Sequence, residues 1–466
     1  MAQVGWVRQL LRWLAPHRLN VGIAFGAGLL GTGVAGLTPL VQKVVVDDIT
    51  GGTGDAVAPW LLLLVLAGLA RFALAYVRRF FGGRVAADVQ YDLRTALFRH
   101  VQRLDVASHD QLQTGQLVGR ATTDVNSLHH LLSLLPLVLG NVLLFFVALC
   151  VMLRLSPLLT LLVFAVVPLM AFATARVRRT IFPASWDASQ QAGVVAGIVE
   201  ESVTGVRVVK GFGQERRELR RLSDGAADLL ASRTRLVRLQ ARFAPTLQVI
   251  PAIAQVAVLA VGGWLTIRGR ITLGTFLAFN VYVTSLVGPV RTGAFLVAFS
   301  QQARASIQRI AEVLDSNPQV ADRPDAAVLS TGAGALELEE VTFGYTASEP
   351  VLESFSLRVE PGETVALVGT SGSGKSTVAL LLPRFYDVHA GAVRIGGTDV
   401  RDVTLESLRR RIGVVFEEPF LFSDTIRANI AYGRPDATDE EVEAAAREAE
   451  AHGFISALPD GYESVV

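Results

Sequence analysis

Residues 131–176 read LLSLLPLVLGNVLLFFVALCVMLRLSPLLTLLVFAVVPLMAFATAR, two long apolar runs separated by little more than Arg154, Leu155 and Ser156. A helix needs about 20 mainly apolar residues to cross the hydrocarbon core of a bilayer, and each run is long enough. The stretch therefore predicts two membrane-spanning helices, near 131–154 and 157–176, joined by a very short turn.

Four further segments of the chain have the same character. They lie near 20–42, 59–80, 244–266 and 272–299, which brings the predicted spans to six. The fifth contains a proline and the sixth a Gly-Pro pair, interruptions that neighbouring helices in a bundle can accommodate. The composition agrees, because 51% of the residues are hydrophobic and only 18% are charged, below the quarter or so of soluble domains.

The connections between these spans differ in length and charge. Residues 81–130 and 177–243 are long and rich in arginine, whereas the segment after the first span is short and acidic. Positively charged loops remain in the cytoplasm, so both long loops, the N-terminus and everything after residue 300 are predicted to be cytoplasmic. The short connection 267–271, with Arg268 and Arg270, runs against this rule. Apolar residues recur at helical spacing in both long loops, which predicts two helical hairpins.

The N-terminal segment, the single cysteine and the net charge support further predictions. Residues 1–19 mix Trp and Leu with Arg, which suits a basic amphipathic helix on a membrane surface or, alternatively, a cytosolic surface helix. They lack the uninterrupted apolar core of a cleavable signal peptide. The lone Cys150 excludes an intrachain disulfide and is expected to be a buried, unreactive thiol. A net charge of +1 gives no general attraction to nucleic acid.

The chain changes character after residue 300. Residues 316–335 are rich in Pro, Asp, Gly and Ala and are predicted to be a linker. From Leu336 onward, short segments such as LELEEVTFGY and LRVEPGETVALVG predict the strands of an α/β domain. The predicted organisation is a transmembrane domain over 1–315, a linker over 316–335 and an α/β domain over 336–466.

The strongest chemical signal is the motif GTSGSGKST, which matches G-x-x-x-x-G-K-[ST]. We expect the strand TVALVG before it and a helix, STVALLLPRF, after it. In that context glycines let backbone N–H groups curl around phosphate oxygens, the lysine reaches the β- and γ-phosphates, and the serine hydroxyl ligates Mg²⁺. The predicted phosphate-binding residues are Gly369, Thr370, Ser371, Gly372, Ser373, Gly374, Lys375, Ser376 and Thr377.

The residues around this motif carry a family resemblance. Residues 336–433, from LELEEVTFGY to RANIAYG, resemble the first half of an ABC transporter ATPase domain. QTGQLVGRATTDVNSL in the first long loop and ESVTGVRVVKGFGQERRE in the second resemble the coupling regions of the exporter branch. The resemblance implies an all-α six-helix transmembrane domain of ABC exporter type, followed by the N-terminal part of an α/β P-loop ABC ATPase domain.

The same resemblance implies a function and its partners. It implies ATP and Mg²⁺ as cofactors, and a dimer with a second half-transporter in the cytoplasmic membrane that exports a substrate by alternating access. Closure of the ATPase domains would reach the membrane through turns near Gly115 and Gly211–Glu215. Tyr345 would stack on the adenine ring, a role that suits its flat aromatic face; a core tyrosine on an exposed hairpin is the alternative.

Two departures from the family pattern qualify this expectation. Glu417 stands where the family carries a glutamine that ligates Mg²⁺. A carboxylate is also a suitable oxygen ligand, so Glu417 either marks one asymmetric site of a heterodimer or is a tolerated variant. The family's signature motif, acidic residues and switch histidine lie beyond Val466. The 466-residue chain is therefore expected to hold nucleotide but not to hydrolyse it, and a non-hydrolysing membrane partner is the alternative function.

One charged residue falls inside a predicted span. Arg71 lies about 12 residues into the second span, roughly 18 Å deep at about 1.5 Å per residue. A cation at this depth normally faces protein or a water-filled cavity. It either faces the transport pathway and favours an anionic substrate, or forms a structural pair with a carboxylate or with helix-end carbonyls. The motifs do not identify the substrate.

Overall fold

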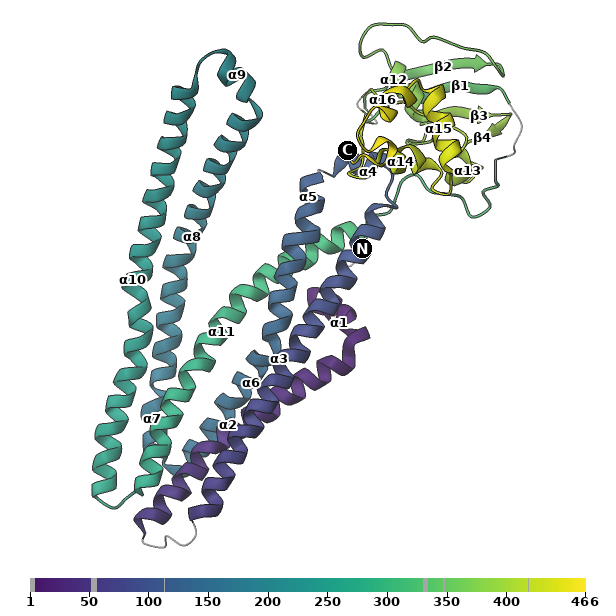
Figure 1. Ribbon diagram of the computed structural model, residues 1–466. Helices are drawn as coiled ribbons and strands as arrows, with labels where there is room; N and C mark the ends of the chain where they lie inside the picture. The colour runs from purple at the N-terminus through teal and green to yellow at the C-terminus, as the bar shows by residue number, and fades with distance from the viewer. Residues whose placement is uncertain (1–4, 52–56, 113, 330–333, 347, 418) are drawn as a thin grey trace. The chain divides into compact units, whose positions relative to one another are not determined.

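The computed structural model describes residues 5–51, 57–112, 114–329, 334–346, 348–417 and 419–466. The chain divides into two compact units (Figure 1). The helical unit comprises Met1–Phe98 and Val118–Leu314, and the sheet-containing unit comprises Arg99–Leu117 and Asp315–Val466. The tip of the first long loop thus belongs to the sheet-containing unit, although the helices that lead to it belong to the other.

Helices build the first of these units and the two long loops, and most of them are long. They are α1 (Trp6–Leu14), α2 (Arg18–Thr50), α3 (Val57–Val101), α5 (Thr114–Gly119), α6 (Val125–Leu155), α7 (Pro157–Phe164), α8 (Val166–Thr204), α9 (Val206–Gly211), α10 (Glu215–Ile267) and α11 (Leu273–Leu314). A 3₁₀ turn joins α1 to α2, and a π-helical turn over Arg120–Asp124 precedes α6. Helices α10 and α11, which carry the prolines of the fifth and sixth predicted spans, continue through them.

Five described helical stretches are long and apolar enough to cross a membrane. They are Trp6–Thr50, Val57–Val101, Gly115–Leu155, Pro157–Thr204 and Val249–Ile267. The first four contain the first four predicted spans, and Val249–Ile267 covers most of the fifth, predicted near 244–266. The sixth predicted span lies in α11, whose described apolar stretch is the shorter Leu273–Leu286. Several side chains between 287 and 298 lie outside the described residues, so the sixth span stays a prediction.

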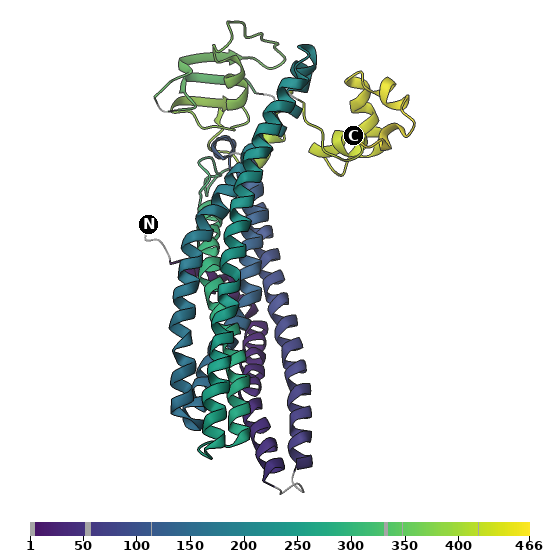
Figure 2. The same cartoon turned by 90° about the vertical axis from the view of Figure 1, so that its left-hand side faces the viewer.

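The two arginine-rich loops are helical, as their periodicity predicts. Helices α8 and α10 lie side by side along their length and are joined at the tip by the short α9 (Figures 1 and 2). In the first loop, α3 extends to Val101 and the tip is the short helix α4 (Val106–Gln111). Gly115, predicted to lie near the turn, is the second residue of α5, which begins shortly after α4 ends at Gln111. Asp105 caps the start of α4 with its side chain.

Buried apolar side chains of α6, α7, α10 and α11 form a hydrophobic cluster in the core of the helical unit. Phe279 and Tyr282 of α11 are fully buried among them, together with Met152 and Leu159. The buried Tyr282 hydroxyl donates a hydrogen bond of 2.7 Å to the carbonyl oxygen of Gly36, which joins α11 to α2. A buried hydroxyl needs such a partner, so this bond fixes how the two helices meet.

Cys150 is exposed, in contrast to the expected burial. Helix α6 lies in a stretch that is long and apolar enough to cross a membrane. Hydropathy alone therefore does not distinguish its packed face from its outer face. Ala148 and Met152 take the packed positions around it. The thiol therefore lies on the outer side of this helix.

The second unit is built on an antiparallel sheet with short helices. The strands are β1 (Leu336–Phe343), β2 (Leu352–Val359), β3 (Ala390–Ile395) and β4 (Thr398–Asp399), in the order β2-β1-β3-β4. Leu338 of β1 is opposite Leu357 of β2 and Val393 of β3, which places apolar residues on one buried face. The helices are α4, α12 (Lys375–Leu381), α13 (Leu405–Arg409), α14 (Ile426–Ile430), α15 (Asp439–Glu448) and α16 (His452–Ser456).

The predicted strand TVALVG is not formed. Residues 364–369 have extended or irregular backbone without ladder partners, and the side chain of Val368 is 90% exposed. Residues 413–416 are also irregular, and Val415 is 99% exposed. A strand is stable only when its N–H and C=O groups pair with a neighbour. No such neighbour pairs with 364–369 among the described residues.

Candidate functional site: a phosphate loop and its aromatic neighbour

The phosphate loop has the backbone that its glycines permit. Gly372 and Gly374 have φ angles of +83° and +86°, a conformation that other residues adopt only with strain. Gly374 also lies so close to β2 that an added Cβ would come within 2.8 Å of the Leu352 side chain. The loop closes with a hydrogen bond of 3.2 Å from the Ser373 N–H to the Thr370 carbonyl, and α12 begins at Lys375.

Lys375 folds back over this loop. Its Nζ donates hydrogen bonds of 3.0 Å and 2.7 Å to the carbonyl oxygens of Gly369 and Thr370, and one of 3.4 Å to Ser373 Oγ. Among the described residues no carboxylate pairs with this ammonium group. A cation held only by neutral oxygens retains its charge for an incoming anion, so the loop fits the phosphates of a nucleotide.

The hydroxyls after the lysine have different surroundings. Ser376 is exposed. Thr377 is 5% exposed, and its Oγ1 lies 3.2 Å from the Tyr345 hydroxyl. Ser376 is therefore available to a magnesium ion at the loop, whereas Thr377 joins the loop to Tyr345.

Tyr345 lies in a cluster of aromatic rings beside the loop. Its ring is 5.3 Å from that of Phe343 and 5.4 Å from that of Tyr386, both edge to face. The side chain is still 52% exposed. Two rings thus hold Tyr345 in place, and its outer face is free to meet a flat ligand.

Glu417 is not brought to the loop by any described contact. The residue is exposed and forms no hydrogen bond or ion pair with the described residues. The segment that carries it is irregular, as is the one before the phosphate loop. Its proposed role as a metal ligand rests on the sequence.

Sequence reasoning did not identify Tyr386, which joins the aromatic cluster to the first loop. Its hydroxyl donates a short hydrogen bond to the carboxylate of Asp110 in α4. Burial, together with this hydrogen bond, raises the pKa of the Tyr386 hydroxyl well above its usual value, so it remains a donor. The aromatic pair in PRFYDV directly after the α12 helix was the available signal, but it does not name a partner 276 residues away.

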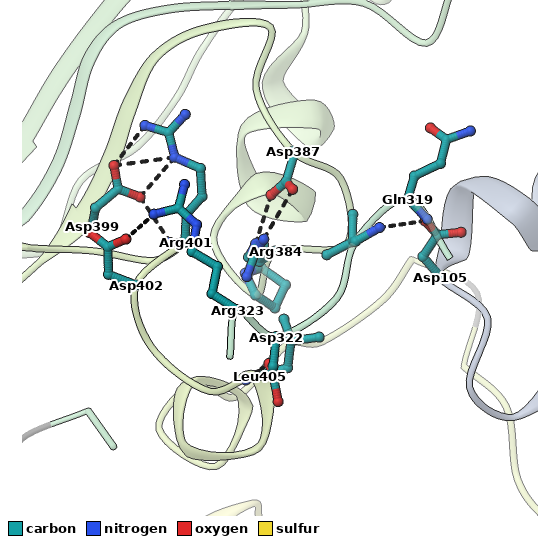
Figure 3. Close-up of polar contacts among 12 residues, drawn as sticks. Asp105, Gln319, Asp322, Arg323, Arg384, Asp387, Asp399, Arg401, Asp402 and Leu405 are labelled. Atoms are coloured by element: carbon teal, nitrogen blue, oxygen red, sulfur yellow. Dashed lines mark hydrogen bonds and ion pairs between the residues drawn. The ribbon is translucent and has the colours of Figure 1, made fainter. Parts of the chain in front are cut away.

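The loop tip is held to the sheet-containing unit at a second point. Asp105 caps α4 by accepting from the Ser108 N–H at 2.9 Å, and its other oxygen accepts from the N–H groups of Gln319 and Val320 at 2.6 Å and 2.8 Å (Figure 3). Burial raises the pKa of this carboxyl, but the hydrogen bonds outweigh burial and hold the pKa below its ordinary value. Val106 and Ala107 of α4 pack against the core of the same unit.

The segment predicted to be a linker is ordered where it is described. Asp322 accepts from the Leu405 N–H at 2.8 Å, and Arg323 forms an ion pair with Asp402 (Figure 3). Leu329 is buried in the core beneath the sheet. The described part of this segment therefore packs as part of the sheet-containing unit.

Comparison with known proteins agrees with this arrangement. Residues 21–290 match the family described as the ABC transporter transmembrane region, and residues 352–462 match the family described as ABC transporter. The chain belongs to the ABC transporter family. Its transmembrane part is the all-α type of ABC exporters, and its ATPase region contains the small antiparallel sheet.

Relatives of this ABC transporter chain come from several bacteria. It is 45% identical over 461 residues to the multidrug efflux ATP-binding/permease protein of Mycobacterium bovis (strain BCG / Pasteur 1173P2), covering 99% of this chain but 38% of that protein. It is 33% identical over 473 residues to the putative multidrug export ATP-binding/permease protein YgaD of Bacillus subtilis (strain 168), covering 99% of this chain and 81% of that protein. The chain thus spans well under half the length of the mycobacterial relative.

A solved structure supports the same fold. The structure of a bacterial Atm1-family ABC exporter with ATP bound superposes with a TM-score of 0.77 at 27% identity. The match covers 96% of this chain and 80% of that one.

Proposed function

We propose that this ABC transporter chain is one half of an ATP-driven exporter, which works as a dimer with a second half-transporter in the cytoplasmic membrane. The phosphate loop carries the proposal, because Lys375 is held by neutral oxygens over a glycine backbone shaped for phosphates. Both long loops and the ATPase region lie on the cytoplasmic side in this proposal, and the transported substrate is unidentified.

The proposed nucleotide site uses residues of this chain in distinct roles. The backbone of Gly369–Thr377 and the Lys375 ammonium bind the phosphates, Tyr345 stacks on adenine, and Ser376 with Glu417 holds Mg²⁺. Magnesium, when bound, neutralises charge on the phosphates as the terminal group is transferred. Glu417 adds a negative charge that a glutamine would not, so it slows or retimes hydrolysis.

The residues after the loop do not supply a catalytic carboxylate in this proposal. Glu440 and Glu441 are exposed in the first turn of α15, where Glu441 accepts from the Thr438 N–H at 2.9 Å in a capping box. The capping box explains Glu441 without catalysis, and Glu440 is an exposed acid at the positive end of the same helix. We therefore propose that the 466-residue chain binds nucleotide but does not turn it over, whereas the full-length dimer hydrolyses ATP.

The test compares Lys375→Ala with Arg410→Ala in the full-length protein in proteoliposomes. Arg410 is an exposed cation of the same unit, paired with Glu406 at 2.8 Å. We expect Lys375→Ala to abolish ATP hydrolysis and the ATP-dependent uptake of a dye panel that contains anionic, neutral and cationic members. Arg410→Ala should leave both unchanged. If Lys375→Ala hydrolyses ATP and takes up dye like the wild type, this loop is not the site that binds ATP for transport.

A non-hydrolysing partner of a heterodimeric transporter is the second candidate, and Glu417 favours it. The Glu417→Gln variant separates the two. If Glu417 depresses a hydrolytic site, ATP hydrolysis by the reconstituted dimer rises severalfold in Glu417→Gln. Unchanged hydrolysis and nucleotide affinity would remove the basis for an asymmetric site.

A further inference from the structure

A cavity in the helical unit contains two arginines that the nucleotide site does not use. It has a volume of about 490 Å³ and lies between α2, α3 and α6. This size is in the range of small-molecule sites in proteins, about 300–1,000 Å³. Most of the lining is Gly, Ala, Leu and Phe, and the charged lining residues are Arg71 and Arg78 of α3.

The two arginines occupy one face of α3. They are seven residues apart, nearly two full turns, so their side chains leave the helix in almost the same direction and about 10 Å apart along its axis. In the predicted topology Arg71 is at mid-membrane depth, and Arg78 is near the cytoplasmic end of the same span. The pair thus extends from the middle of the bilayer towards the cytoplasm.

Neither guanidinium is neutralised by a group in the part of the chain that the structure describes. Among the described residues, neither Arg71 nor Arg78 forms an ion pair or a hydrogen bond, and no carboxylate lines the cavity. The first carboxylate to follow on α3, Asp88, pairs instead with Arg84 and with His17. The structural pairing that would explain a membrane arginine without a ligand is therefore absent from this part of the chain.

The remaining polar groups of the cavity are already engaged. The Thr32 hydroxyl donates to the Gly28 carbonyl of its own helix at 2.8 Å, and the Asn141 amide donates to Thr292 Oγ1 at 3.1 Å. The arginines are the charged groups of this lining and can meet a negatively charged ligand. An apolar lining with two unneutralised cations matches a molecule that has an apolar body and a negative group.

The glycines of α2 create the room for this arrangement. A Cβ at Gly28 would lie 3.1 Å from Cδ of Arg78 and 3.1 Å from the Pro136 carbonyl oxygen, so the absence of a side chain lets the Arg78 stem pass. A Cβ at Gly31 would lie 3.2 Å from the Leu74 Cβ. The close approach of α2 and α3 thus directs the half-buried Arg78 into the cavity.

We propose that this cavity binds an amphipathic organic anion as the transported substrate, with Arg71 and Arg78 binding its negative group. The inference rests on the proposed export function, since it names the chemical class of substrate. Two sources share this chemistry, a soluble organic anion and a lipid with an anionic headgroup.

The test measures binding without ATP, in full-length transporter held in nanodiscs of phosphatidylcholine. The soluble pair is 8-anilinonaphthalene-1-sulfonate and its neutral analogue N-phenyl-1-naphthylamine, with empty nanodiscs as background. The lipid pair is fluorescent phosphatidylglycerol and phosphatidylcholine that carry the same fluorophore. If the sulfonate binds more tightly than its neutral analogue, the ligand is a soluble organic anion. If phosphatidylglycerol binds more tightly than phosphatidylcholine, the ligand is an anionic lipid.

The variants are Arg71→Gln, Arg78→Gln and the charge-retaining Arg71→Lys. Arg79→Gln is the matched control, because Arg79 is the next arginine of α3 and does not line the cavity. Loss of one charged contact should raise the Kd of the preferred anion about tenfold, with the uncharged partner unaffected. Arg71→Lys should retain most of the affinity, and Arg79→Gln all of it.

Two results would overturn the inference. One is equal binding of anionic and uncharged probes by the wild type. The other is a loss of protein level or dimer in both Arg→Gln variants with no change in probe selectivity, which would assign the arginines to structure, for example to a carboxylate of the second subunit. Failure of the export function appears separately, as absence of ATP hydrolysis and of ATP-dependent dye uptake in the wild type.

Discussion

The Tyr386 hydroxyl donates a hydrogen bond to the Asp110 carboxylate, and the Tyr386 ring packs edge to face against Tyr345. One side chain thus contacts both the tip of the first long loop and the residue proposed to hold adenine. The same loop tip is anchored at Asp105 by the N–H groups of Gln319 and Val320. This arrangement leads to several measurable expectations.

The Tyr386→Phe change should separate the two contacts. It retains the ring against Tyr345 and removes the hydrogen bond to Asp110. We expect nucleotide affinity to change less than twofold or so, while ATP-stimulated dye uptake falls severalfold, because one hydrogen bond to a charged group contributes about 1.5–3 kcal/mol. Tyr432→Phe is the control, since Tyr432 is exposed and stacks only on Phe422. A large loss of nucleotide affinity in Tyr386→Phe would instead place the hydroxyl in the binding site.

The Asp105 anchor should weaken at low pH. The folded pKa of Asp105 lies below its ordinary value of 3.8, so its stabilising contribution is complete above pH 3.8 and is lost as pH falls through the folded pKa. We expect amide hydrogen exchange in residues 316–322, corrected for intrinsic rates, to be slow at pH 7 and to quicken only below about pH 4. Asp105→Asn, which resembles the protonated acid, should exchange faster at pH 7, by about tenfold.

The exposed Asp325 provides the comparison for this anchor. Asp325→Asn should leave exchange in residues 316–322 unchanged at every pH, because that residue makes none of the described contacts to Asp105. Protection that does not depend on pH in the wild type would show that the charge of Asp105 is not what holds the segment.

Two ion pairs of the helical unit should differ in their contribution to stability. Asp124 is buried, accepts from Ser306 Oγ at 2.9 Å and from Arg309 Nε at 2.8 Å, and precedes α6. Asp124→Ala should cost about 3 kcal/mol, because it leaves Arg309 and Ser306 without their acceptor. Glu312→Ala, which removes the partner of Arg120 at 3.8 Å, should cost at most about 1 kcal/mol because Glu312 is exposed. The two variants are compared by thermal inactivation of the detergent-purified protein. An equal loss of stability in both variants would contradict the expected ranking.

The predicted topology can be tested with single cysteines in a background lacking Cys150. Gly54 lies outside the described residues and in the loop predicted to be external. Ser223 in α10 is exposed, and Ser→Cys there changes little, whereas the neighbouring Gly225 lies against Ile198. An impermeant maleimide should label position 54 in intact cells and position 223 only after permeabilisation. External labelling of position 223 would overturn the orientation.

The sequence alone was sufficient for the features that depend on local chemistry. Apolar runs long enough to cross a bilayer predicted the helices that carry the spans, because hydropathy and length decide whether a helix can enter a membrane. Glycine and lysine spacing predicted the phosphate loop, since positive φ angles at Gly372 and Gly374 need no contact from elsewhere in the chain. Helical spacing likewise predicted that both long loops are helical.

The tertiary structure decided everything that depends on which distant residues meet. The periodicity of α3 places Arg71 and Arg78 on one face, but only the approach of Gly28 and Gly31 of α2 gives that face a cavity. The contact of Tyr386 with Asp110 spans 276 residues, and no local pattern in either segment encodes it. The segment TVALVG fails as a strand for the same reason, because a strand needs a neighbour to satisfy its backbone groups, whereas a helix satisfies most of its own.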